Sequence, residues 1–285
     1  MEIIMFKNKN SVYTAFFYLL LAASVMMAAA VSVTLYLNYD ARTQLTEGTL
    51  HTILMALIAP VFGVIGLVWS ALLKKTGQSN VICAEKEGEI GLFGRISCML
   101  CAVAGVFVAV SYFTADYTDP LKDLLSQPAQ TAYYTHVLSV ALAVCAAVAF
   151  VTLVFGKDGG YSPVRQLPLV GFAMLYLIRL HTDMSVMLMS TRRMICVFGI
   201  CMLLLFLMAK IRVLCSKQAQ LFSIVSGSLA AGTLIISGVS SLVLNLTGVA
   251  SDGVQLFFYI FELTLGVYVL SELARPMTSG VKVTK

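Results

Sequence analysis

Eight long apolar runs dominate this sequence and limit what the chain can fold into. A helix that crosses a bilayer needs about 20 predominantly apolar residues. The runs that meet this requirement cover residues 11–37, 50–72, 92–113, 131–155, 164–183, 191–212, 219–246 and 254–274. Strands of a membrane barrel would instead alternate in segments of about ten residues. The pattern predicts an all-α, polytopic transmembrane helix bundle of about eight spans, forming a single domain over residues 1–285.

The composition excludes a water-soluble globule. Hydrophobic residues make up 59% of the chain and charged residues 12%, whereas a soluble domain carries about 25% charged residues. The first run is preceded by Lys7 and Lys9 and contains the small residues Ala28, Ala29 and Ala30, as a signal peptide would. Its apolar stretch nevertheless continues to Leu37, beyond the roughly 7 to 15 residues of a signal peptide, and so predicts an uncleaved span.

The distribution of basic residues predicts the orientation. If the N-terminus is cytoplasmic, the cytoplasmic side receives fourteen cations: Lys7, Lys9, Lys74, Lys75, Lys86, Arg95, Lys157, Arg165, Lys210, Arg212, Lys217, Arg275, Lys282 and Lys285. The outer side receives five, which are Arg42, Lys122, Arg179, Arg192 and Arg193. This bias follows the positive-inside rule and predicts that both termini are cytoplasmic. The cations are spread over short loops, so we expect no nucleic-acid partner.

One carboxylate falls deep inside a predicted span. Glu262 lies nine residues beyond Gly253, or about 13 Å along the last helix. A charge at the bilayer centre costs about 2.5 to 3.5 kcal/mol. Glu262 is therefore either a neutral acid that is hydrogen-bonded to a neighbouring helix, or a functional group that pairs with a cation, binds a solute or relays a proton.

A second group of ionisable residues gathers where the fifth run ends and the sixth begins. Arg179 and Asp183 are four residues apart, on one helical face, and are expected to pair, while His181 points elsewhere. Arg192 and Arg193 follow Ser190, a candidate N-cap. The group is interpreted either as a structural salt bridge or as a basic vestibule that attracts an anion.

The seventh run is rich in small and hydroxyl residues. Ser223 with Gly227, and Ser228 with Gly232, form small-xxx-small pairs that let helices approach closely. Tight helix packing is the simpler interpretation. The alternative is a hydroxyl-lined pathway that faces Glu262.

The remaining reactive residues give no sign of a cofactor or of catalysis. The histidines, His51, His136 and His181, lack the paired spacing of metal ligands, so we expect no metal, haem or other cofactor. The seven cysteines are an odd number without extracytoplasmic members, which argues against disulfides and predicts buried thiols that act as small apolar residues. No nucleophile with a neighbouring base is evident, so a non-enzymatic role is expected; an intramembrane enzyme is the less favoured alternative.

The stretch from Tyr176 to Arg212 carries the one resemblance to known proteins. Its Leu180-His181-Thr182-Asp183-Met184-Ser185 segment, followed by Ser190, Lys210 and Arg212, resembles uncharacterised multi-pass membrane proteins of Gram-positive bacteria. The resemblance implies a bacterial cytoplasmic membrane location and no activity.

These observations lead to two functional hypotheses. The first is an integral membrane protein that binds or translocates a small, anionic solute through polar groups at Glu262, Arg179, Asp183, Arg192 and Arg193. The second is a non-catalytic anchor or interaction subunit of a larger membrane complex. In both, the lipid bilayer is the main partner.

Overall fold

The structure is an all-helical bundle. This computed structural model describes residues 2–40, 45–46, 48–75, 92–114, 127–155, 163–182, 190–215, 219–248 and 253–278. The helices are α1 (Glu2–Asn38), α2 (Thr49–Lys75), α3 (Leu92–Thr114), α5 (Gln127–Phe155), α6 (Leu167–Thr182), α7 (Thr191–Leu214), α8 (Gln220–Leu246) and α9 (Gly253–Thr278), with the 3-10 helix η3 (Pro163–Gln166) before α6. The all-α prediction is confirmed. The short antiparallel pair β1 (Tyr39–Asp40) and β2 (Leu45–Thr46), between α1 and α2, was not predicted.

Six helices within the described residues are long and apolar enough to cross a membrane, so the chain is a multi-pass integral membrane protein. These six segments are Tyr13–Asn38, Thr49–Lys75, Leu92–Val110, Arg192–Val213, Leu221–Leu246 and Leu256–Arg275. The other two predicted spans coincide with α5 and with η3 plus α6. Their described apolar segments, Ala143–Phe155 and Leu167–Ile178, are shorter.

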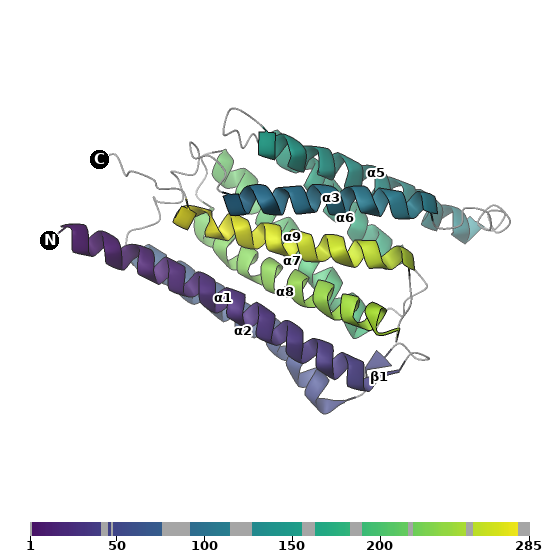
Figure 1. Ribbon diagram of the computed structural model, residues 1–285, viewed down its shortest axis with the longest axis horizontal. Helices are drawn as coiled ribbons and strands as arrows, with labels where there is room; N and C mark the ends of the chain where they lie inside the picture. The colour runs from purple at the N-terminus through teal and green to yellow at the C-terminus, as the bar shows by residue number, and fades with distance from the viewer. Residues whose placement is uncertain are drawn as a thin grey trace.

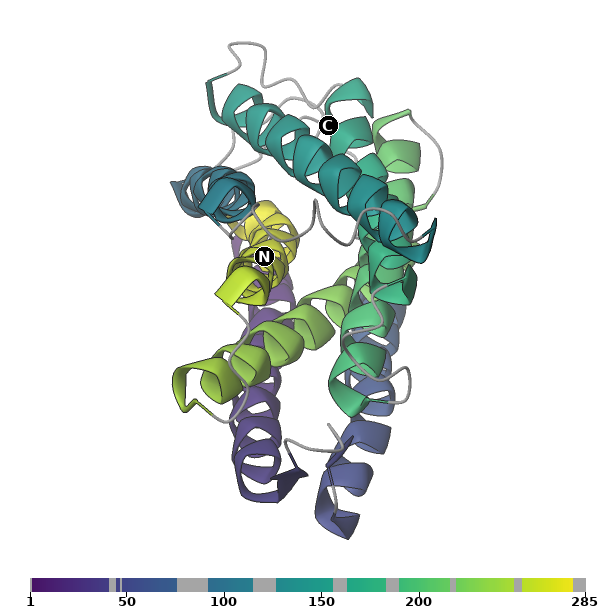
Figure 2. The same ribbon diagram turned by 90° about the vertical axis from the view of Figure 1, so that its right-hand side faces the viewer.

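Six helices pack side by side in a closed ring. Going around it, α7 contacts α8, α8 contacts α9, α9 contacts α3, α3 contacts α5, α5 contacts α6, and α6 returns to α7. Outside this ring, α1 and α2 pair with each other and lie against α8 (Figures 1 and 2). Polar side chains that point into this ring are therefore separated from lipid.

Helix α8 lies at the junction of the ring and the α1/α2 pair, and its small residues permit that position. A Cβ atom added at Gly227 would lie 3.0 Å from the ring of Phe206, and one added at Gly232 would lie 2.6 Å from the ring of Phe62. Larger side chains would push α7 and α2 away. Tight packing, predicted from the small-xxx-small pairs, is confirmed at both glycines.

Helix α1 is an integrated part of the bundle. The Tyr13 hydroxyl donates a 2.8 Å hydrogen bond to the backbone carbonyl of Leu273 in α9, and the Tyr13 ring packs edge-on against Trp69 of α2 at 4.7 Å. In Figure 1, the beginning of α1 and the end of α9 lie at the same end of the bundle.

Candidate functional site

Two clusters of buried polar side chains lie between the ring helices. The first, the Glu262 cluster, is formed by Tyr176 of α6, Arg192 and Cys196 of α7, Ser237 and Ser241 of α8, and Tyr259 and Glu262 of α9. The second, the Lys210 cluster, is formed by Gln166 of η3, Lys210 of α7, and Tyr268 and Glu272 of α9. Both draw on α7 and α9, the two helices that flank α8 in the ring.

Glu262 binds three other helices at once. Its Oε1 atom accepts hydrogen bonds from the Tyr176 hydroxyl and, at 2.9 Å, from the Cys196 thiol. Its Oε2 atom accepts a 2.9 Å bond from the Ser237 hydroxyl. The residue is 1% exposed. Three polar side chains lie within hydrogen-bond distance of the two carboxyl oxygens, and these bonds offset part of the cost of burying the group.

Aromatic rings enclose the Tyr176 side of this carboxylate. The Tyr176 ring stacks on Phe258 of α9 at 5.5 Å and on Phe172 of α6 at 5.6 Å. Phe172 in turn packs edge-on against Phe261 at 4.9 Å. These contacts fix the direction of the Tyr176 hydroxyl, so the hydrogen bond to Glu262 is preorganised by packing.

Arg192 is the cation of the same cluster. Its Nε atom donates a 3.0 Å hydrogen bond to the Ser241 hydroxyl, and its guanidinium carbon lies 4.2 Å from the centre of the Tyr259 ring. The residue is 9% exposed. Its Nη2 atom has no hydrogen-bond partner among the described residues. A buried guanidinium donor without an acceptor costs free energy, and an anion would supply the missing acceptor.

The spacing of residues on three helices places Arg192 and Glu262 about one helical turn apart. Arg192 and Cys196 are four residues apart on α7, and Tyr259 and Glu262 are three apart on α9. Residues at these spacings are neighbours on one helical face, about 5 to 6 Å apart. On α8, Ser237 and Ser241 are also four residues apart. Ser241 binds Arg192, and Ser237 binds Glu262. The cluster thus holds an arginine and a carboxylate that share a site without a direct ion pair.

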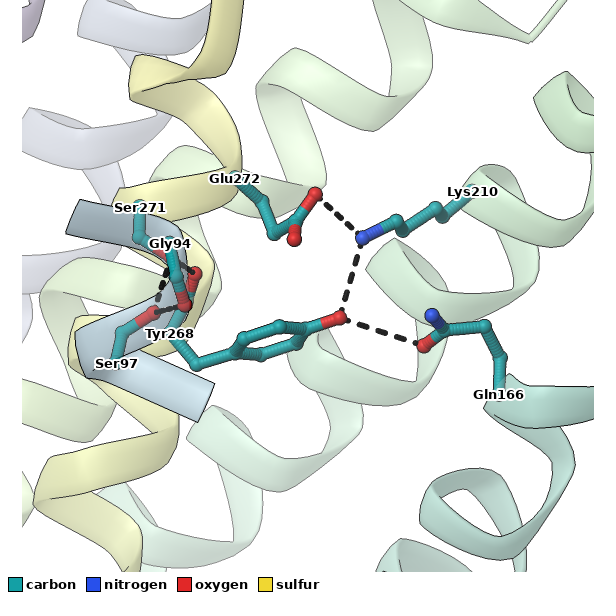
Figure 3. Close-up of polar contacts among 7 residues, drawn as sticks. All are labelled: Gly94, Ser97, Gln166, Lys210, Tyr268, Ser271 and Glu272. Carbon is teal, nitrogen blue, oxygen red and sulfur yellow. Dashed lines mark hydrogen bonds and ion pairs between the residues drawn. The ribbon is translucent and has the colours of Figure 1, made fainter. Parts of the chain in front are cut away.

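The Lys210 cluster contains a true ion pair. The Lys210 ammonium lies 2.5 Å from Glu272 Oε2 and donates a 3.1 Å hydrogen bond to the Tyr268 hydroxyl. That hydroxyl donates to Gln166 Oε1 at 3.4 Å. Figure 3 shows the four side chains pointing toward one another from α7, α9 and η3. On the other side of α9, the hydroxyls of Ser271 and of Ser97 in α3 lie 2.6 Å apart.

An apolar layer separates the two clusters. Arg192 and Lys210 are 18 residues apart on the same face of α7, which corresponds to about 27 Å along the helix. Leu203 and Leu207 lie between these two residues on α7, and Leu265 lies between Glu262 and Tyr268 on α9. Each of the three leucines is 0% exposed. The structure therefore has polar groups toward both ends of the ring and a packed apolar layer between them.

The residues predicted at the end of the fifth span have different outcomes. Arg193 is 5% exposed, like its neighbour Arg192, so the two arginines are buried and do not form an open basic vestibule. The predicted vestibule is closed because α8 and α9 cover the start of α7, where Ser241 and Tyr259 contact Arg192. His181 is exposed near the end of α6. The predicted partner of Arg179, Asp183, lies outside the described residues, so that pairing stays a prediction.

The predicted cap of α7 is only partly realised. Ser190 occupies the N-cap position, as expected, but its hydroxyl makes no capping hydrogen bond.

Several residues of the two clusters were not singled out from the sequence. Tyr176 and Cys196 resemble ordinary residues of an apolar span, and only their neighbours in three dimensions reveal their bonds to Glu262. Lys210 was assigned to the cytoplasmic loop as one more basic residue. The signal that distinguishes it is its position on the Arg192 face of α7, together with an acidic residue, Glu272, at the matching depth of α9.

The six described cysteines are free thiols, but the prediction that they are buried is wrong for Cys145 and Cys215, which are exposed on the bundle surface. The described residues contain no group of three His, Cys, Asp or Glu side chains placed to hold a metal ion. No family model, curated protein or solved structure matches this chain. The function must therefore be inferred from the clusters themselves.

Proposed function

We propose that this integral membrane protein binds and translocates a small monovalent oxyanion, a carboxylate or a sulfonate, through the helix ring. The observation that carries the proposal is Arg192, a guanidinium that is 9% exposed and whose Nη2 has no hydrogen-bond partner within the described part of the chain. Guanidinium groups bind oxyanions with directed hydrogen bonds. Glu262, one turn deeper, provides the opposite charge that keeps the empty site neutral.

The proposed orientation has eight spans, with both termini in the cytoplasm of a bacterium. The excess of basic residues on the cytoplasmic side supports this orientation, as does the position of the first and last helix ends at the same end of the bundle (Figure 1). In this orientation the Glu262 cluster lies in the outer half of the ring, and the Lys210 cluster lies near its cytoplasmic end. The packed apolar layer between the clusters would have to open for a solute to pass.

An anion-dependent stabilisation tests the binding step. We expect sodium acetate and sodium methanesulfonate to raise the midpoint temperature of unfolding of the detergent-purified chain by several degrees. A ligand at about 100 times its dissociation constant contributes about 2.7 kcal/mol. Sodium gluconate at the same ionic strength, too bulky for a packed ring, serves as the reference salt. Substitution R192Q is expected to abolish the anion effect.

Substitution S240A is the matched control for R192Q. Ser240 lies on α8 beside Ser241, but its hydroxyl donates to the Ile236 carbonyl of its own helix at 2.6 Å, so the anion effect should persist. An equal response of R192Q and the wild type would remove Arg192 as the binding group. Uptake of radiolabelled methanesulfonate into proteoliposomes then separates translocation from binding alone.

A scaffolding role is the second candidate, and one observation favours it: Glu262 connects α6, α7 and α8 to α9 through three hydrogen bonds. In this role, the carboxylate holds the helices together and takes no part in binding or transport. Substitution E262Q separates the roles, because the amide keeps two acceptor contacts and can donate to Ser237. Lost uptake with unchanged expression supports a pathway, whereas loss of the folded bundle supports a scaffold.

A further inference from the structure

The charge balance of the Glu262 cluster has a consequence for the mechanism, which rests on the proposed function. If Arg192 is protonated and Glu262 is ionised, the empty site carries no net charge. A monovalent anion bound at Arg192 would leave two negative charges around one cation, within about one helical turn. Two anionic groups that share a buried site do not both remain ionised, because desolvation and mutual repulsion favour protonation of one.

Glu262 can accept a proton if one neighbouring hydroxyl rotates, with no other change in its surroundings. The Ser237 hydroxyl now donates to Oε2 at 2.9 Å. A serine hydroxyl both donates and accepts, so rotation about its C–O bond would let it accept from a protonated Oε2 at the same distance. The two donors to Oε1, Tyr176 and Cys196, would stay in place.

The other groups near Glu262 do not compete for this proton. Among the described residues, the ionisable groups of this cluster around Glu262 are Tyr176 of α6, Cys196 and Arg192 of α7 and Tyr259 of α9. From α3, the thiol of Cys101 contacts α9 at the Thr264 carbonyl. Tyrosine and cysteine are already protonated in their neutral forms, and arginine keeps its proton in proteins. Helix α8 presents the uncharged hydroxyls of Ser237 and Ser241. Tyr13, the α1 residue bonded to α9, contacts Leu273, about three turns away.

We infer that binding of a small monovalent oxyanion at Arg192 is coupled to the uptake of one proton from solution by the Glu262 carboxylate. The proton forms an O–H bond at Oε2, the anion enters with it, and the loaded site gains no net charge. A neutral load has a physical advantage in this bundle, because the layer of Leu203, Leu207 and Leu265 opposes the passage of net charge. The protein would thus act as a proton–anion cotransporter.

Methanesulfonate is the decisive probe, because this anion of a strong acid cannot carry the proton itself. The full-length protein in detergent is titrated with sodium methanesulfonate in weakly buffered solution that contains a pH-indicating dye. We expect uptake of about one proton per bound anion, and a dissociation constant that rises about tenfold per pH unit as the pH is raised. Substitution E262Q should still bind the anion but lose both effects, while S240A should keep them.

The outcomes separate this inference from the proposed function. Anion binding by the wild type without proton uptake and without pH dependence would overturn the coupling and leave the binding site intact. Absence of any binding by the wild type would overturn both. If E262Q does not fold, the pH dependence of the wild type alone decides between coupled and uncoupled binding.

Discussion

Replacing Lys210 by methionine is expected to lower the free energy of unfolding by about 3 to 5 kcal/mol, the usual effect of breaking a buried ion pair from one side. The Lys210 and Glu272 side chains are 10% and 6% exposed, and 2.5 Å separates Nζ from Oε2. Methionine has a similar length but no charge, so the Glu272 carboxylate would lose this cation and the Tyr268 hydroxyl would lose a donor. Reversible unfolding in mixed detergent micelles measures the change.

Two further variants show whether charge causes this loss. Lys74 is exposed at the end of α2, and K74M should change stability by less than about 0.5 kcal/mol. The double substitution K210M with E272Q should recover much of the lost stability, because it also removes the negative charge that Lys210 balances. If K210M were as stable as K74M, the ion pair would contribute nothing to holding α7 against α9.

The positions of the helices could be predicted from the sequence because hydrocarbon thickness sets the length of each apolar run. The predicted span 191–212 corresponds to Thr191–Leu214, and 219–246 corresponds to Gln220–Leu246. Helix α1 is the exception, since it begins at Glu2 and not near residue 11. Hydropathy detects only the apolar part of a helix, whereas backbone hydrogen bonding continues through polar residues.

The order of the helices around the ring could not be predicted in the same way. Neighbours depend on the shapes of side chains that meet across helices, such as Phe62 of α2 against Gly232 of α8. These two residues are far apart in the sequence, and no local pattern relates them. Lipid tails are as apolar as leucine, so hydrophobicity alone does not favour one pairing of helices over another.

The candidate site was predicted in part, and the part that was found has a clear physical reason. A carboxylate inside an apolar run is costly enough to be noticed, so Glu262 was selected, whereas Arg192 was selected as one of the basic residues that gather where the fifth run ends and the sixth begins. The closeness of Glu262 and Arg192 was not predicted, because the sequence does not show which helices lie next to each other. Tyr176 and Cys196 carry no such cost, and their role as donors to Glu262 is visible only in the folded chain.

Substituting Gly238 by alanine is expected to destabilise the bundle by at least about 1 to 3 kcal/mol, the usual cost of overpacking. An added Cβ atom would lie 2.8 Å from Leu263 Cβ and 2.9 Å from its backbone nitrogen. A backbone atom cannot rotate away, so α8 and α9 must separate. The same movement would lengthen the bond between Ser237 and Glu262, which are the chain neighbours of the two clashing residues.

Gly63 of α2 is the matched control for this substitution. The nearest atom to an added Cβ is Leu229 Cδ2 at 4.0 Å, an ordinary contact, and alanine is favoured over glycine in a helix by about 1 kcal/mol. G63A should therefore equal or exceed the wild type in stability, while G238A loses both stability and anion binding. If G238A were as stable as G63A, α8 and α9 would not meet as closely as Gly238 requires. The Ser237 bond to Glu262, and with it the proposed proton acceptor, would then lack its structural basis.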